Sequence, residues 1–186
     1  MRLSIKAEND IIKKTQKQLA FLSKNAPSAL ASSLNRAATN VNSNVGKEVR
    51  KNYTVKSADI KATLRKTKAT KSRLRADIIS SGSTLPLDKF KVSPKTENPN
   101  RRKPIKVSIK KGTPKAVLGA FVANLNGVKV FQRSGKARLP IKRLHGLSVP
   151  QMVGKEETRA NLEKEGQAMF IKRVDHEVKR LLEKRG

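Results

Sequence analysis

The sequence predicts an α+β fold in which helices at both ends of the chain flank a small antiparallel sheet. Apolar residues recur every three or four positions from residue 30 to 49, which is the spacing of one face of a helix. Apolar and polar or basic residues alternate over 105–109, as in a strand with one buried face. A second helical pattern runs from 162 to 182. Helical patterns at the two ends and strand patterns in the middle together predict the α+β class.

The N-terminal segment predicts a strand followed by a helix. Residues 2–6 alternate in the manner of a short strand. Asn9 and Asp10 are both favourable N-caps, so the first helix is expected to begin there and to end near Asn25. Its apolar face would consist of Ile11, Ile12, Thr15, Leu19 and Leu22.

A longer helix is predicted after Pro27, a residue that suits the first turn of a helix. Its apolar stripe is Leu30, Leu34, Ala37, Ala38, Val41, Val45 and Val49, and Tyr53 lies at its end. The opposite face is rich in Ser and Asn and carries little charge, which is unusual for a face in plain solvent. We therefore expect it to contact a neighbouring subunit, and an ordinary solvated face is the alternative. The expected contact residues are Ser33, Arg36, Asn40 and Asn44.

The middle of the chain predicts mixed structure. Ser57 can cap a short helix that includes Leu64, and residues 74–78 alternate as a strand. Residues 80–104 contain four prolines, which argue against regular structure, so we expect a long extended loop there.

From residue 105 the pattern predicts a meander of three or four antiparallel strands with basic residues on one face. The expected strands are 105–109, 117–122, 128–131 and a short one within 139–144. Asn126-Gly127 is the expected turn pair between the second and third strands.

The last helix is predicted to open at Ser148, with Pro150 near its first turn. Gly154 and Gly166 weaken it, so we expect either a kink or a start at Lys155. Its apolar stripe is Leu162, Met169, Phe170, Val174, Val178, Leu181 and Leu182.

Charge is the most unusual property of these 186 residues. Lys and Arg number 43 and Asp and Glu 14, a net charge of +29. The helical N-terminal part, 1–55, carries +7, the basic middle, 56–143, carries +20, and the C-terminal helical part, 144–186, carries +2. We expect these parts to form a single domain over 1–186. A basic middle between balanced ends predicts one surface facing a polyanion, and a solvated basic face without a ligand is the alternative.

Composition excludes several classes of function. The sequence has no Cys, which excludes disulfides, zinc–thiolate sites, iron–sulfur clusters and a thiol nucleophile. No apolar run approaches the roughly 18 residues of a membrane span, and the first ten residues lack the apolar region of a signal peptide. We therefore expect no membrane association, and a protein made and kept in a cytoplasm unless it leaves inside a larger particle.

Motifs for catalysis are missing from the sequence. It has no phosphate-binding loop, no nucleophile elbow and no metal-ligand spacing, so we expect no enzyme activity, no cofactor and no metal. A nuclease or other hydrolase that uses Asp77 or Asp88 is another alternative. The sequence also lacks zinc-finger spacing and an aromatic ladder, which leaves sequence-blind attraction of Lys and Arg to phosphate. A histone-like or ribosome-associated nucleic-acid-binding protein is therefore a second functional reading.

Two segments resemble a known family. Residues 130–152 read VFQRSGKARLPIKRLHGLSVPQM, and residues 26–36 read APSALASSLNR before the long helix. Both are similar to the phage and prophage minor tail protein Z family, in which a strand, a basic turn, a Leu-Pro-Ile run and a Gly-x-Ser-Val-Pro-Gln stretch lead into a C-terminal helix.

The resemblance implies a structural virion protein, made in the host cytoplasm, that completes the head-proximal end of the tail of a long-tailed phage. It implies an α+β fold similar to neck proteins, assembly as a homo-oligomeric ring, and contact with the tail terminator, connector and tail tube. No catalytic residue carries over.

Such a ring subunit at a DNA channel needs a positive face without base readout. The residues expected to contact genomic DNA are Arg101, Arg102, Lys103, Lys106, Lys110, Lys111, Lys136, Arg138, Lys142 and Arg143. An acidic protein neighbour is the alternative partner for the same residues.

Overall fold

The computed structural model describes residues 1–19 and 25–183 and confirms an α+β fold. The chain divides into two compact units, each built from separate stretches of sequence. Unit 1 comprises Met1–Gly46, Leu64–Ser81 and Val153–Gly186, and unit 2 comprises Lys47–Thr63 and Gly82–Met152. The expectation of one domain over 1–186 stays a prediction.

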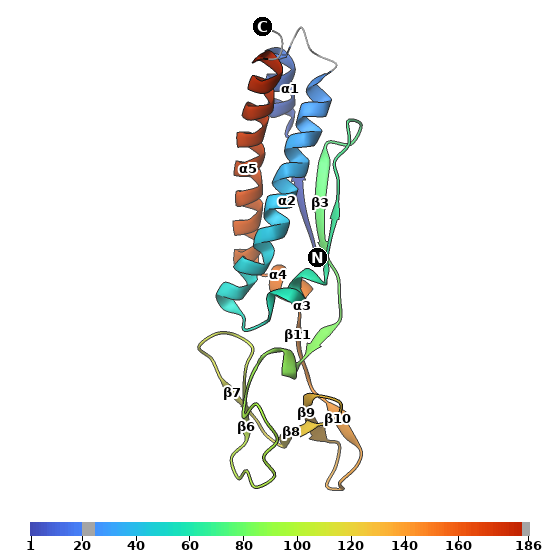
Figure 1. Cartoon of the computed structure of the whole chain (residues 1–186), viewed down its shortest axis with the longest axis vertical. Coiled ribbons are helices and arrows are strands. Elements are labelled where there is room, and N and C mark those ends of the chain that lie inside the picture. The colour runs from blue at the N-terminus through green and yellow to red at the C-terminus, as the bar shows by residue number, and fades with distance from the viewer. Residues whose placement is uncertain (20–24, 184–186) are drawn as a thin grey trace. The chain divides into compact units, whose positions relative to one another are not determined.

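Unit 1 combines three helices with a three-stranded antiparallel sheet in the order β1-β3-β2 (Figure 1). Its elements are β1 (Arg2–Lys6), α1 (Asn9–Gln18), α2 (Ala26–Asn52, whose last residues belong to unit 2), β2 (Leu64–Thr67), β3 (Arg75–Ser80) and α5 (Glu156–Glu183). The predicted first strand, the long helix and the strand predicted over 74–78 are confirmed, and the last of these continues to Ser80. Two details were wrong: α1 follows Glu8 as its N-cap and ends at Gln18 rather than near Asn25, and Leu64 begins a strand instead of closing a helix. The predicted apolar position Leu22 lies outside the described residues.

The core of unit 1 forms where α2 and α5 pack against β1. The predicted stripe of α2 is buried along its whole length, and α5 contributes Leu162, Phe170, Val174 and Val178. Met169, Leu181 and Leu182 of the predicted α5 stripe are not buried, and Leu182 is 48% exposed. Gly166 lets α5 approach its neighbours closely, because a Cβ at this position would lie 2.9 Å from Ile5 Cδ1 and 3.1 Å from Val41 Cγ2.

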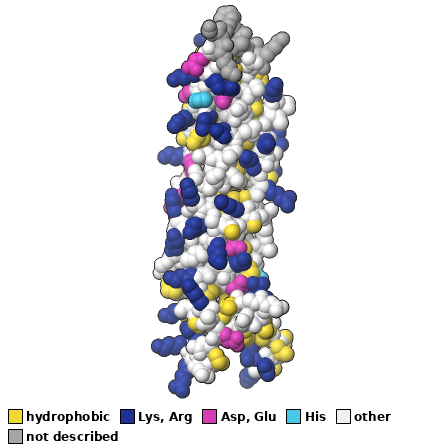
Figure 2. Space-filling model, viewed as in Figure 1, with side chains coloured by type: hydrophobic (Ala, Val, Ile, Leu, Met, Phe, Trp, Pro, Cys, Tyr) yellow, Lys and Arg dark blue, Asp and Glu magenta, His cyan; other side chains and the backbone are white. Residues whose placement is uncertain are grey.

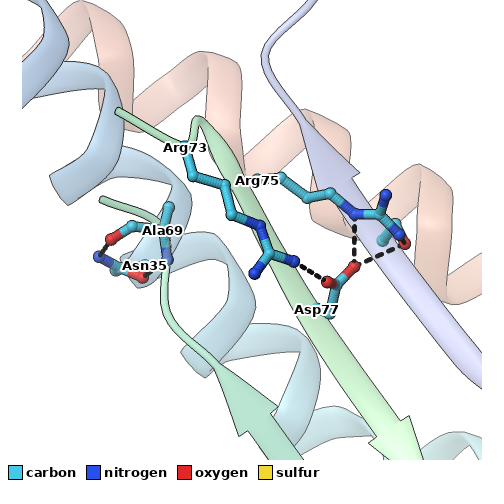
Figure 3. Close-up of polar contacts among 6 residues, drawn as sticks. Asn35, Ala69, Arg73, Arg75 and Asp77 are labelled. Atoms are coloured by element: carbon cyan, nitrogen blue, oxygen red, sulfur yellow. Dashed lines mark hydrogen bonds and ion pairs between the residues drawn. The ribbon is translucent and has the colours of Figure 1, made fainter. Parts of the chain in front are cut away.

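The β2–β3 hairpin is held to α2 through the side chain of Asn35. Its Nδ2 donates to the carbonyl of Ala69 (3.0 Å), and its Oδ1 accepts from the backbone N–H of the same residue (2.8 Å), as Figure 3 shows. Thr39 accepts a hydrogen bond from Lys66 Nζ at 2.7 Å. Part of the polar face of α2 therefore packs on the protein's own hairpin.

Asp77 on β3 is the most deeply buried carboxylate among the described residues, and its side chain is only 1% exposed. It accepts hydrogen bonds from Ser4 Oγ (2.7 Å), Arg75 Nε (2.8 Å) and Arg73 Nη2 (2.9 Å) (Figure 3). Burial acts to raise the pKa of Asp77, but the hydrogen bonds from Ser4 and Arg75 and the charges of Arg75 and Arg2 outweigh it and leave the pKa below its usual value. The carboxylate thus ties β1 to β3 in its ionised form.

This geometry predicts how the stability of unit 1 depends on pH. Because the folded-state pKa of Asp77 is depressed, the unfolded chain binds the proton more tightly. The contribution of Asp77 to stability is therefore complete above the unfolded pKa of about 4 and is lost as the pH falls through the folded value. The thermal midpoint of Asp77→Asn should fall less between pH 5 and pH 2.5 than that of the unaltered protein. An equal fall of the thermal midpoint with decreasing pH in the two proteins would contradict this role.

Unit 2 contains short antiparallel strands with few helical turns (Figure 1). Its elements are α3 (Ser57–Lys61), β4 (Thr84–Pro86), η2 (Leu87–Lys89), β5 (Lys91–Ser93), β6 (Ile105–Ser108), β7 (Lys115–Val117), β8 (Ala120–Asn124), β9 (Val128–Arg133), β10 (Ile141–Arg143), β11 (His145–Ser148) and α4 (Val149–Val153). The strands form two three-stranded sheets, β5-β6-β7 and β10-β9-β8, and the pair β11-β4.

Two predictions for this region were wrong. The single meander is split between two sheets, because Gly119 adopts a left-handed conformation (φ 69°) and ends β7 before β8 begins. The stretch 80–104 is not one extended loop: β4, η2 and β5 lie within it, and residues 94–104 form the connection to β6. The prolines are tolerated because β4 and β5 are short edge strands, Pro86 ends β4 and Pro94 follows β5.

Two local predictions were confirmed. Asn126 (φ 51°) and Gly127 (φ 98°) both have the left-handed conformation of the turn between β8 and β9. Ser148 caps α4 through a reciprocal pair: Gln151 N donates to Ser148 Oγ at 3.4 Å, and Ser148 N donates to Gln151 Oε1 at 2.9 Å. The C-terminal helix is interrupted at Gly154, so α5 begins at Glu156.

None of the helices in the described part of the chain is long and apolar enough to cross a membrane.

Candidate nucleic-acid interface

Positive charge is concentrated in unit 2, which carries 21 Lys and Arg against four Asp and Glu. The larger unit 1 carries 22 against ten. Figure 2 shows Lys and Arg side chains spread over the visible face, with few acidic side chains among them. All ten predicted DNA-contact residues belong to unit 2, so the structure brings them into one compact part of the chain.

Two of the ten have a bonding role within the unit. Arg143 binds Asp88 through both Nη2 and Nε, at 2.8 to 3.1 Å. Arg101 donates to the carbonyls of Lys103 (2.6 Å) and Pro104 (2.9 Å), closing the turn that leads into β6. Their guanidinium groups hold unit 2 together and are less available to a ligand than the other eight.

A hollow of about 470 Å³ lies on one face of the β5-β6-β7 sheet and brings together Lys106 and Lys111 from the predicted set. Lys91, Ser93 and Ser108 line it as well and were missed by the sequence reading. The alternation Lys91-Val92-Ser93 was the available signal of a strand with a polar face. It lay in the stretch that the prolines led us to treat as loop.

A second hollow, of about 710 Å³, has a different character. Arg101, Lys103 and Arg138 line it, but so do the apolar side chains Phe121, Leu125, Leu139 and Ile141. Arg133 also lines it and lies over the Phe121 ring, with its Cζ 5.5 Å from the ring centroid. This groove mixes apolar and basic side chains, and the acidic Glu97 lines it as well.

The remaining predicted residues are exposed at separate places. Arg102 lies in the connection before β6, and Lys110 in the turn after it, where its backbone forms a bridge with Tyr53. Lys136 lies between β9 and β10, and Lys142 lies on β10.

The four predicted subunit-contact residues all lie in the part of α2 that belongs to unit 1, and they differ in exposure. Ser33 is buried, and its hydroxyl donates to the carbonyl of Ala29 at 2.8 Å, so it faces the interior of this chain. Asn44 is half-buried and donates to Glu165 and, at 3.3 Å, to Asn40 Oδ1. Arg36 is the one exposed member of the four.

The acidic residues considered for a nuclease are engaged in ion pairs. Asp77 is held by Arg73 and Arg75, and Asp88 by Arg143. Within residues 1–19 and 25–183, no group of three or more His, Cys, Asp or Glu side chains is arranged to hold a metal ion.

The comparison with protein families identifies a family for this chain. The sequence model of the prophage minor tail protein Z (GPZ) family matches residues 11–185, which is almost the whole chain. No curated protein and no solved structure matches the chain. The match includes both segments on which the sequence resemblance rested, 26–36 and 130–152. In the structure the second segment contains most of β9, the strand β10, whose Arg143 binds Asp88, and the Ser148–Gln151 helix cap. The chain therefore belongs to the prophage minor tail protein Z family and is a structural component of a phage tail.

Proposed function

We propose that this tail protein completes the head-proximal end of the tail of a long-tailed phage, assembles there as a ring, and presents unit 2 to the genomic DNA. Family membership supports a role in the tail. The observation that supports contact with DNA is the net charge of +17 on unit 2. The side chains of eight of the ten predicted contact residues form no hydrogen bond or ion pair with another described residue. A channel lining needs positive charge without base readout, which is what Lys and Arg without an aromatic ladder provide.

In this proposal unit 1 supplies the ring contacts. Bringing copies of unit 2 face to face would oppose two strongly positive surfaces, whereas α5 carries charges of both signs. Arg36 and the half-buried Asn40 mark the part of α2 that is left for a neighbour, since Ser33 is buried and Asn35 is occupied by Ala69. The other neighbours in the particle would be the tail terminator, the connector and the tail tube.

The test is to purify virions from the phage or induced prophage, detect the chain by mass spectrometry, and locate it by cryo-electron microscopy. We expect a ring at the head-proximal end of the tail, and particles lacking the chain should be defective at that end. A chain present in infected cells but absent from purified virions would overturn the proposal and favour a histone-like or ribosome-associated role.

A further inference from the structure

We infer that the hollow on the β5-β6-β7 sheet is a binding pocket for a DNA backbone phosphate. Lys91, Lys106 and Lys111 line it together with Ser93, Ser108 and Thr54, and no acidic side chain lines it. We call it the lysine pocket. The inference rests on the proposed function, because it names the partner of the basic surface and the place where that partner binds.

Strand register places the polar groups on one face. Lys91 is opposite Ser108, and Ser93 is opposite Lys106, so the four side chains of β5 and β6 project from the same side of the sheet. The residues between them, Val92 and Val107, are opposite each other and project from the other side. The pocket is thus built by a regular pair of strands.

Thr54 fixes the two strands that carry these groups. Its hydroxyl accepts from the backbone N–H of Lys91 (3.2 Å) and donates to the carbonyl of Ser108. The backbone N–H of Lys111 donates to the carbonyl of Asn52 at 2.9 Å, which anchors the turn that carries the third lysine. The pocket is therefore held by hydrogen bonds before any ligand arrives.

The lysine ammonium groups and serine hydroxyls of the pocket are unengaged. None of the three lysine ammonium groups forms an ion pair with a described residue. The hydroxyls of Ser93 and Ser108 likewise have no hydrogen-bond partner within residues 1–19 and 25–183. Three positive charges around one hollow repel one another, and an anion bound between them relieves that repulsion.

The chemistry of the lining favours phosphate over carboxylate. Lysine ammonium groups and serine hydroxyls are common partners of phosphate oxygens in DNA complexes. The arginine fork binds carboxylate and phosphate alike, whereas lysine binds phosphate oxygens as a point charge, and all three cations of this pocket are lysines. The groove lined by Arg101, Arg133 and Arg138 together with apolar side chains is the part of unit 2 whose chemistry fits an acidic protein segment better.

The first experiment measures binding of a 20-base-pair duplex to the full chain by fluorescence anisotropy between 50 and 200 mM salt. The triple variant Lys91→Gln, Lys106→Gln, Lys111→Gln should bind about 30-fold more weakly at 100 mM salt, and its salt slope should be smaller by about two to three, as expected for lost phosphate contacts. The matched control is Lys47→Gln, Lys61→Gln, Lys115→Gln, three exposed lysines of unit 2 that belong neither to the pocket nor to the ten predicted contact residues. It removes the same charge from unit 2, and Lys115 lies on the opposite face of the sheet, since it is paired with Val107. We expect a loss of threefold or less in the control. Equal losses in both triple variants would overturn the pocket.

A second variant keeps the charge constant. Ser93→Ala with Ser108→Ala removes the hydroxyl donors and should weaken duplex binding about five- to twentyfold, because hydrogen bonds to a charged group are strong. Ser83→Ala with Ser134→Ala, two exposed serines of the same unit, is the control and should change nothing. Diffuse attraction predicts no change in either variant, and that result would overturn the inference. Circular dichroism of each variant checks that it is folded.

Competitors separate the sources of the anion. Inorganic phosphate should shift the backbone amide NMR signals of Lys91, Lys106 and Lys111 and compete weakly with the duplex, whereas poly-glutamate should compete poorly. A poly-glutamate affinity equal to that of the duplex and lost in the same triple variant would overturn DNA as the partner. If the pocket variants bind DNA normally and the chain is found in virions, only the pocket is overturned. If the pocket binds DNA but the chain is absent from virions, only the tail-completion role is overturned.

Discussion

Gly146→Val is expected to destabilise unit 2 severely and to abolish the proposed binding of DNA. A Cβ at Gly146 would lie 2.9 Å from Phe90 Cε2, 3.0 Å from Ile109 Cδ1 and 3.2 Å from Leu87 Cδ2. β11 therefore passes so close to three apolar side chains that a Cβ at this position would force them to move. Valine adds three carbons there, and we expect a cost of about 3 kcal/mol, the upper part of the range for overpacked cores.

The cause of that loss can be isolated. Valine suits strands, so poor β-propensity cannot explain destabilisation at this strand position. Gly135→Val, in the turn after β9 with nothing within 4 Å of the added Cβ, is the control and should leave stability nearly unchanged. Amide hydrogen exchange should show lost protection in β6, η2 and β11 of Gly146→Val. Native protection with normal DNA affinity would show that unit 2 tolerates the side chain and would contradict this packing.

Gly166→Leu should have a comparable effect on unit 1. The Cβ of residue 166 would meet Ile5 Cδ1 at 2.9 Å and Val41 Cγ2 at 3.1 Å, and the rest of the leucine has to enter the same contact between α5, β1 and α2. We expect a loss of about 3 kcal/mol or more and, for a chain of this size, a thermal midpoint lower by about 6–12 °C.

A graded series separates packing from helix propensity. Gly166→Ala gains about 1 kcal/mol of helix propensity and meets mainly the flexible end of Ile5, so the two effects should nearly cancel. Ala168→Leu, at an exposed position of the same helix, is the control for size and should be neutral within about 0.5 kcal/mol. A leucine at 166 that leaves the midpoint unchanged would contradict the close approach of α5.

Features set by neighbouring residues could be predicted from the sequence. The stripe from Leu30 to Val49 is buried because its period matches the helix, and the Asn126-Gly127 turn forms because these two residues tolerate left-handed backbone conformations. Ser148 caps its helix as expected, since the cap needs only the residues that follow.

Features that depend on distant partners could not be predicted. β5 forms because Val92 pairs with Val107 of β6, and nothing in the proline-rich stretch indicates that pairing. The polar face of α2 was expected to meet another subunit, but Asn35 bonds to Ala69, which lies 34 positions along the chain.

The candidate site was predicted in part for the same reason. The counting of charges located the basic region and two of the lysines of the pocket, Lys106 and Lys111. Lys91, Ser93 and Ser108 join them only through the register of β5 against β6, and a single sequence does not contain that register.

The most direct measurement is photocrosslinking inside intact, DNA-filled virions, with a photoreactive amino acid placed at Lys110 of unit 2 or at Lys172 on α5. Both positions are exposed and both are lysines, so the substitution removes one charge in either case. If unit 2 faces the genome, the chain labelled at 110 should yield a DNA adduct at least about tenfold more often than the chain labelled at 172. Equal yields at the two positions, or adducts at 172 alone, would contradict the claim that the charge of unit 2 serves to contact DNA.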